Sequence, residues 1–227
     1  MNRRDILLSA VALTTVAAAP LSTAPVPVLK APKSGPVRVA VVVGERSTVI
    51  DFAGPWEVFQ DAQSDQGFEL FMVSDEIRTL DATAGMQIVP HYTYASSPPP
   101  HVVLMGAQGE HTPAKISWIR EASARADLVM SVCTGAFLLA KTGLLDGMTA
   151  TTHHDFYDNF EKQFPKVQLV RGPRYVEHGK IATAGGLTSG IELALRIVER
   201  YYGTPTANQT AYYMEYGRSA QRPSAPG

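Results

Sequence analysis

The chain contains a single cysteine, Cys133, in the stretch "MSVCTGAF". It lies where an apolar stretch predicted to be a buried strand, 127–132, passes directly into a short helical segment, 134–143. A reactive residue between a strand and a helix is the arrangement of a nucleophile elbow, whose tight turn crowds its neighbours, and here Ser131 and Gly135 are both small. The N–H groups at the start of the helix predict a lowered thiol pKa. A core-filling cysteine is the alternative, but the elbow position favours a nucleophile.

A carboxyl group at a second strand-to-helix junction could work with this thiol. Asp51 lies in "VIDFAGPWEVF", after a predicted strand, 37–43, and before a helix, 55–62, which Pro55 is predicted to begin. In a parallel sheet both junctions face the carboxyl edge. A carboxylate beside a thiolate should have a raised pKa, because adjacent anions repel, and it would be a general acid or base at neutral pH. The alternative is a loop aspartate that caps the helix.

A glycine-containing loop follows the predicted strand within 98–107, in "VLMGAQGEH". Backbone N–H groups in such a loop can stabilise a developing negative charge, as in an oxyanion hole. Gly106 and Ala107 are the predicted donors, with the N–H of Thr134 on the other side. An ordinary turn would explain the glycines equally well.

Two histidines stand together in "ATTHHDF", and His153 ends a predicted strand, 148–154. It could face the same sheet edge as Cys133. The alternative is that one histidine caps a helix and the other is solvated. The sequence contains no HExxH, CxxC, GxGxxG or P-loop pattern, so we expect no metal and no cofactor.

Predicted strands and helices alternate along the chain. We expect strands at 37–43, 68–74, 98–107, 127–132, 148–154 and 180–184, a hairpin at 78–94, further extended runs within 168–178, and helices at 55–62, 112–126, 134–143, 156–164, 189–203 and 207–215. This alternation predicts an α/β fold with a mainly parallel sheet covered by helices on both faces. No linker-like stretch interrupts residues 37–217, which favours one domain.

The two ends of the chain differ from this pattern. Residues 1–24 contain Arg3 and Arg4 before an uncharged stretch and resemble a twin-arginine export signal, which predicts a periplasmic or otherwise exported protein. Residues 25–36 are expected to be a Pro-rich linker, and 218–227 a flexible tail. With 20 Lys and Arg against 21 Asp and Glu, the charge gives no reason to expect a nucleic-acid partner. We expect a small-molecule substrate and no membrane association after processing.

With these residues placed, the chain resembles the ThiJ/PfpI superfamily (class I glutamine amidotransferase-like), and within it the isocyanide hydratase branch. The resemblance runs from about Val37 to Tyr216 and is carried by "DFAGPWEVF", "SVCTGAFLLAKTGLLDGMTATTHH" and "GKIATAGGLTSGIELALRIVERYYG". It implies a flavodoxin-like three-layer sandwich, an elbow cysteine with unfavourable backbone dihedral angles, and a homodimer.

The resemblance also implies an activity. In the hydratase branch the thiolate attacks the terminal carbon of an isocyanide, and water hydrolyses the thioimidate to an N-formamide. Carried over, Cys133 is the nucleophile and Asp51 the acid/base, and Thr134 offers a hydroxyl or N–H near the sulfur. Gly106 lies in the oxyanion loop, and His153 matches a histidine that lies near the cysteine in several relatives.

The chain departs from some relatives at informative positions. Peptidase-like relatives have His after the nucleophile, where this chain has Thr134, and many have a Pro-Gly-Gly loop where it has Met105, Gly106 and Ala107. The chain ends at Gly227, so we expect no helix-turn-helix of the kind found in related regulators. Two alternatives stay open: a glyoxalase-like enzyme for 2-oxoaldehydes, in which His153 moves protons, and a non-enzymatic redox or ligand sensor using Cys133.

Overall fold

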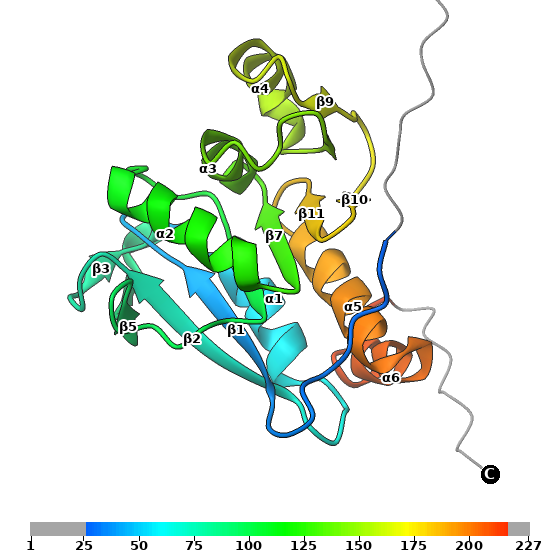
Figure 1. Cartoon of the computed structure of the whole chain (residues 1–227). Coiled ribbons are helices and arrows are strands. Elements are labelled where there is room, and N and C mark those ends of the chain that lie inside the picture. The colour runs from blue at the N-terminus through cyan, green and yellow to red at the C-terminus, as the bar shows by residue number, and fades with distance from the viewer. Residues whose placement is uncertain (1–25, 218–227) are drawn as a thin grey trace, which may run out of the picture.

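A computed structural model describes residues 26–217, and its centre is a seven-stranded sheet with the strand order β10-β11-β7-β6-β1-β2-β5 (Figure 1). All neighbouring strands are parallel except β10 and β11. The strands are β1 (Val37–Val42), β2 (Phe68–Ser74), β5 (Tyr92–Thr93), β6 (Val102–Met105), β7 (Leu128–Val132), β10 (Tyr175–His178) and β11 (Ile181–Ala184). The predicted mainly parallel α/β sheet is confirmed.

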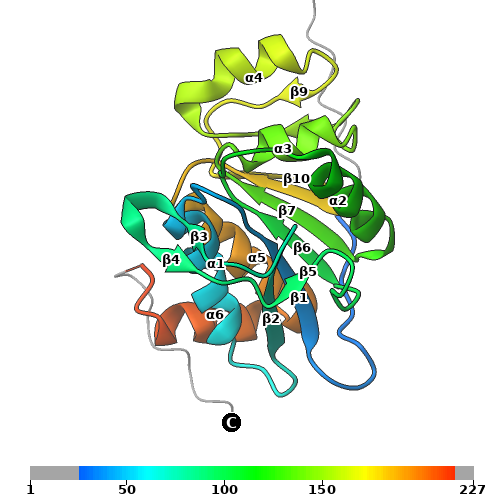
Figure 2. The ribbon, with the colours of Figure 1, turned by 90° about the vertical axis from the view of Figure 1, so that its left-hand side faces the viewer.

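Helices cover both faces of this sheet (Figures 1 and 2). The helices α1 (Val49–Gln60), α5 (Ser189–Tyr202) and α6 (Thr204–Tyr213) lie on one face, and α2 (Pro113–Arg125) and α3 (Gly135–Lys141) lie on the other. Beyond α3 lie α4 (Tyr157–Gln163) and a two-stranded sheet of β8 (Thr149–Ala150) and β9 (Gln168–Leu169). The three layers confirm the flavodoxin-like sandwich.

The register of the central strands brings their carboxyl ends level. Met105 at the end of β6 pairs with Val42 at the end of β1 and with Ser131 on β7, while Val132 pairs with Ala184 at the end of β11. The segments that follow these four strands therefore leave the sheet at one edge, where ligands of parallel α/β sheets bind. The predicted site residues that follow these strands therefore lie at this edge: Asp51 after β1, Gly106 and Ala107 after β6, and Cys133 and Thr134 after β7.

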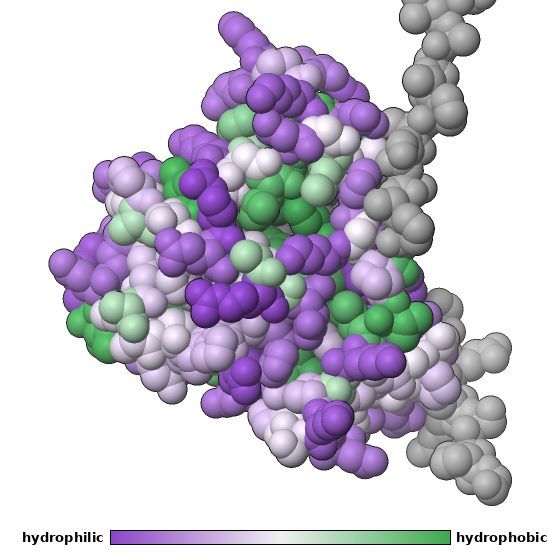
Figure 3. All heavy atoms as spheres, in the orientation of Figure 1, coloured by the Kyte–Doolittle hydropathy of each residue, from purple (hydrophilic) through white to green (hydrophobic). Residues whose placement is uncertain are grey.

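The central strands read as continuous apolar runs because both of their faces are buried. Alternate side chains serve different layers: Val39 and Val41 of β1 pack in the cluster under α1 and α5, whereas Ala40 and Val42 pack in the cluster under α2 and α3. The outer surface is different, and hydrophilic side chains predominate over α2 (Figure 3). None of the helices within residues 26–217 combines the length and apolar character that crossing a membrane requires.

Helix α1 begins earlier than predicted. It starts at Val49, so Pro55 lies inside the helix, and Asp51 is in its first turn. Pro55 misled the prediction because proline is favoured in a first helical turn and unfavourable in a helix interior. The prediction that Asp51 precedes the helix was therefore wrong, and so was the alternative of a loop aspartate, although the residue does lie at the carboxyl edge of the sheet.

Two other extended segments differ from their predictions. The strand expected at 148–154 shortens to β8, which pairs with β9 outside the central sheet. The hairpin expected at 78–94 is a two-residue antiparallel pair, β3 (Leu80–Asp81) with β4 (Gln87–Ile88), around the turn η1 (Thr83–Gly85), and β5 then joins the central sheet. Apolar, β-branched composition alone does not decide which sheet a short strand joins.

The described part of the expected linker, residues 26–36, is fixed to the domain. The side chain of Leu29 is buried in the core, and its N–H donates to the carbonyl of Arg200 at 3.2 Å. The guanidinium of Arg200 in turn donates to the carbonyl of Pro27 at 3.1 Å. This segment is therefore a strap on α5. The predicted export signal, 1–24, and tail, 218–227, lie outside the described residues.

Close packing of α1 on α5 holds Asp51 in place, and Gly54 makes it possible. A Cβ at position 54 would lie 2.9 Å from Cγ1 of Ile191 on α5. We expect Gly54→Val to lower the free energy of unfolding by about 2 kcal/mol through overpacking, measured by urea denaturation. Ala124→Val on the exposed face of α2 is the matched control, with an expected loss of about 0.5 kcal/mol. Equal losses in both variants would contradict this account of the contact.

Candidate active site

Cys133 adopts a backbone conformation that is costly for a side chain with a Cβ. Its φ is 59°, in the left-handed region that favours glycine. The surrounding structure pins it on both sides. Its N–H is shared between the carbonyls of Ala184, at 3.2 Å, and Gly185, at 2.8 Å. Its own carbonyl accepts a hydrogen bond from the hydroxyl of Thr152 at 2.9 Å. The sulfur is thus presented by a strained turn, as the elbow prediction requires.

Two glycines allow the loop after β6 to approach this elbow. A Cβ at Gly135 would overlap the carbonyl oxygen of Met105, so the start of α3 lies directly on the end of β6. A Cβ at Gly106 would lie 2.6 Å from the Cβ of Asp51. The predicted site residues Gly106 and Gly135 therefore lie in the site. For both, the structure shows that the absence of a side chain allows neighbouring segments to pack closely.

The Asp51 side chain is fully buried beside the thiol. Its Oδ2 accepts a hydrogen bond from the N–H of Ala107 at 2.9 Å, and its Oδ1 has no partner among the described residues. Burial raises the pKa of Asp51 to about 6, although the hydrogen bond from the Ala107 N–H and the nearby Cys133 thiol and Leu187 N–H act to lower it. A carboxyl group with this pKa can both accept and donate a proton near neutral pH.

The thiol differs from its predicted state. Burial, followed by the charge of Asp51, raises the pKa of Cys133 to about 12, although the N–H groups of Thr134 and Leu187 favour the thiolate. The prediction of a lowered thiol pKa was therefore wrong for the resting site, because desolvation and the neighbouring carboxylate outweigh the N–H groups. The pair holds one proton at neutral pH, and that proton rests on sulfur.

The backbone donors are arranged differently from the prediction. The Ala107 N–H is used by Asp51, so it does not point freely at a substrate oxyanion. The N–H groups of Thr134 and Leu187 both act to lower the pKa of Cys133. Leu187 and Thr152 were missed by sequence reasoning. Leu187 lies in "AGGLTSG", where the glycines indicate a turn but cannot show that the N–H of a leucine at φ 54° reaches the sulfur.

An open pocket of about 580 Å³ adjoins the elbow. That volume suits a small organic molecule. The pocket is lined by residues from the segments after β1, β6 and β7 and from α4: Arg46, Gln108, Gly109, Glu110, His111, Thr134, Phe137, Lys141, Phe156, Asn159 and Gln163. Cys133 itself is not among the lining residues, but Thr134, the next residue along the chain, is.

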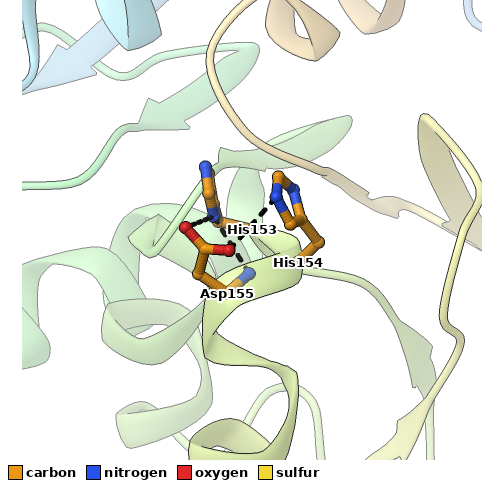
Figure 4. A group of neighbouring side chains, drawn as sticks. All are labelled: His153, His154 and Asp155. Atoms are coloured by element: carbon orange, nitrogen blue, oxygen red, sulfur yellow. Dashed lines mark hydrogen bonds and ion pairs between the residues drawn. The ribbon is translucent and has the colours of Figure 1, made fainter.

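His153 lies at the flank of the site, where it starts the short turn η2 (His154–Phe156) (Figure 4). Its ring occupies the space that a side chain at Gly186 would need. Its Nδ1 accepts a hydrogen bond from the N–H of Asp155 at 3.2 Å, and its ring stacks on His154 with centroids 4.4 Å apart. These contacts match the capping alternative.

The same three residues, His153, His154 and Asp155, bring potential metal ligand atoms within 4.8 Å of one another. Two imidazoles and one carboxylate are a donor set for a transition metal. However, the Nδ1 of His153 already serves as the backbone acceptor of the turn. Since capping accounts for this geometry, no metal enters the chemistry below.

Comparison with known proteins agrees with this geometry. The model of the DJ-1/PfpI family matches residues 37–200. An isonitrile hydratase of Pseudomonas putida is 30% identical over 74% of this chain and 73% of its own length. A transcriptional regulator of Pseudomonas aeruginosa, GbdR, is 24% identical over 74% of this chain, which spans 47% of the regulator. A crystal structure of a ThiJ/PfpI family protein from Pseudomonas syringae superimposes with a TM-score of 0.73 at 25% identity, covering 87% of this chain and 81% of that one.

The buried Asp51 should cost stability at neutral pH. An aspartate in the unfolded chain has a pKa of about 3.9, whereas in the fold it is raised to about 6. The folded state therefore binds the proton more tightly, and the resulting stability is present at low pH and lost as the pH rises from about 4 to about 6.

We expect Asp51→Asn to raise the free energy of unfolding by roughly 2 kcal/mol at about pH 7.5, since the amide oxygen still accepts from the Ala107 N–H. The gain should disappear near pH 4, where Asp51 is itself neutral. Urea denaturation at both pH values measures it, with the exposed Asp65→Asn as control, expected to shift stability by less than about 0.5 kcal/mol. If Asp51→Asn were instead less stable than the wild type at neutral pH, the buried carboxylate would not be a source of instability.

Proposed function

Because this chain belongs to the DJ-1/PfpI family, we propose that it is a cysteine-dependent hydratase of a small electrophile, with isocyanides converted to N-formamides. The observation that carries the proposal is the buried pair of Cys133 and Asp51, which holds one transferable proton. The relative named isonitrile hydratase supports the choice of isocyanide among electrophiles.

In the first step the thiol adds across the terminal carbon of the isocyanide. The sulfur of Cys133 forms a bond to this carbon, and the thiol proton reaches the same carbon through the carboxyl group of Asp51. The product is a thioimidate on the enzyme, and no atom has been lost. The N–H groups of Thr134 and Leu187 lie where negative charge builds up on sulfur before the carbon bond is complete.

In the second step water adds to the thioimidate carbon, and the carboxylate of Asp51 accepts a proton from it. Asp51 passes this proton to the nitrogen. The hydroxyl proton of the adduct then moves through Asp51 to the sulfur as the carbon–sulfur bond breaks, and the N-formamide leaves. The thiol and the carboxylate are restored, so in sum isocyanide and water give N-formamide. A pKa of about 6 at Asp51 suits a group that gives and takes a proton in turn near neutral pH.

A second candidate is a ligand-binding module without turnover. The similarity to regulators named CdhR, GbdR and GlxA favours it, because these matches cover 49%, 74% and 56% of this chain. Sensing by oxidation is less favoured, since burial and a raised pKa keep Cys133 a thiol. A glyoxalase role for His153 is also less favoured, because its Nδ1 is held by the turn.

We also propose that the chain is exported and forms a homodimer. Export rests on the twin-arginine-like pattern of residues 1–24, and dimerisation rests on the family resemblance. Neither proposal enters the chemistry.

The assay is formation of N-formamide from 4-methylphenyl isocyanide by purified protein. We expect Cys133→Ala to abolish turnover, and Asp51→Asn to lower it by roughly a hundredfold or more, because proton transfer at this position is lost. Asp65→Asn should retain the wild-type rate. Formamide release by the wild type no faster than by Cys133→Ala would refute the hydratase. If 4-methylphenyl isocyanide still bound in the pocket, the ligand-binding module would be favoured.

A further inference from the structure

The pocket beside Cys133 contains two cationic side chains that the proposed reaction does not use. Arg46 lines it from the segment after β1, and Lys141 lines it from the last turn of α3. Within residues 26–217 neither side chain takes part in an ion pair, although most of the other arginines of that region are paired or hydrogen-bonded. One acidic side chain, Glu110, also lines the pocket, so the cations exceed the acids by one.

His111, in the same pocket, lies in the field of Lys141. Its Nδ1 is buried without a hydrogen-bond partner among the described residues, and the residue lines the same pocket. Burial, followed by the charges of Lys141 and Lys115, lowers the pKa of His111 to about 4. Burial disfavours the charged imidazole whatever the sign of the field. The two lysine charges add a positive potential, which disfavours a further positive charge and favours a negatively charged ligand group.

The backbone holds Arg46 over the pocket. Its φ is 57°, and its N–H donates to the carbonyl of Asp81 at 2.7 Å. Gly109 lies opposite, with its N–H donating to the carbonyl of Glu45 at 2.7 Å, and a Cβ at position 109 would lie 3.4 Å from Nε of Arg46. A glycine here lets the guanidinium group lie close against the loop after β6.

The other wall is apolar. Phe137 and Phe156 meet edge to face, with ring centroids 6.4 Å apart and planes at 85°. Thr134 completes the lining next to the nucleophile. A ligand that fills the pocket thus meets aromatic rings, the cations of Arg46 and Lys141, and Thr134, which directly precedes α3 and follows Cys133.

We propose that this pocket selects an electrophile that carries a carboxylate, held by Arg46 and Lys141 while the reactive carbon lies at Cys133. For an isocyanide the substrate class is then a short apolar body with an isocyano group at one end and a carboxylate at the other. The identity of the reactive group rests on the proposed function. The charge selection rests on the pocket alone.

Alkylation of the single cysteine tests the charge selection without any turnover. Iodoacetate and iodoacetamide react at the same carbon and differ in charge, so the ratio of their rates at Cys133, followed by intact mass, reports the local field. Because Asp51 repels iodoacetate equally in both proteins, the comparison is between wild type and variant, and we expect the ratio to fall roughly threefold to tenfold in an Arg46→Gln, Lys141→Gln double variant. The difference between the two proteins should shrink as salt is raised.

Arg125→Gln is the control, because it removes one positive charge at the end of α2, where the chain enters β7 at the opposite edge of the sheet. Its ratio should equal that of the wild type. An unchanged ratio in the double variant, or an equal fall in the control, would overturn the proposal. Circular dichroism verifies that the variants are folded.

If the buried thiol does not react with either reagent, a binding measurement tests the charge selection instead. By calorimetry, 4-formamidobenzoate should bind Cys133→Ala about tenfold more tightly than its methyl ester, and the double variant should remove this difference. Equal affinity for acid and ester would overturn the proposal. Absence of formamide production together with a charge preference would refute the hydratase and leave the charge selection standing.

Discussion

The structure depends on keeping a thiol and a carboxyl group in contact where water is excluded. Both groups are acids, and burial disfavours the charged form of each. No cation within the described residues contributes to the pKa of Asp51 or Cys133, and only hydrogen-bonding groups offset the burial. This choice has a chemical consequence. A guanidinium beside Asp51 would lower its pKa and keep it ionised, whereas N–H dipoles leave its pKa near 6.

Dipoles act over short distances, so the pair requires an accurately placed backbone. The level carboxyl ends of β1, β6, β7 and β11 bring the required N–H groups to one edge. Gly106 and Gly135 then remove the side chains that would separate Asp51, the loop after β6 and the elbow. The hydrogen bond from Thr152 to the Cys133 carbonyl holds the strained turn from the other side. Strain at Cys133 and burial of Asp51 are thus two costs of the same arrangement.

The features that the sequence predicts are those that neighbouring residues determine. The elbow at Cys133 follows from a strand, a small residue on either side and a helix, all within a few positions, and β2 was predicted with its observed ends. The state of the thiol could not be predicted in the same way, because it depends on Asp51, 82 positions away, and on burial. The roles of Thr152 and Leu187 likewise depend on how distant segments meet. Pro55 is a case where a local pattern misled the prediction. Its residue type favours a helix start, but α1 begins six residues earlier, at Val49, and packs on α5.

The site divides into two parts that are built differently. The reacting pair is positioned by backbone and by glycines, and its side chains are buried. The pocket is formed by side chains on surface segments and on α4, which can change without moving the sheet. A change at Arg46 or Lys141 would therefore alter which molecule reaches Cys133 and leave the proton shared with Asp51 in place. This division explains how one fold can occur in an enzyme named isonitrile hydratase and in proteins named as regulators. The pair limits the chemistry to what a thiol and one mobile proton can do, and the pocket decides which electrophile, or which unreactive ligand, meets them.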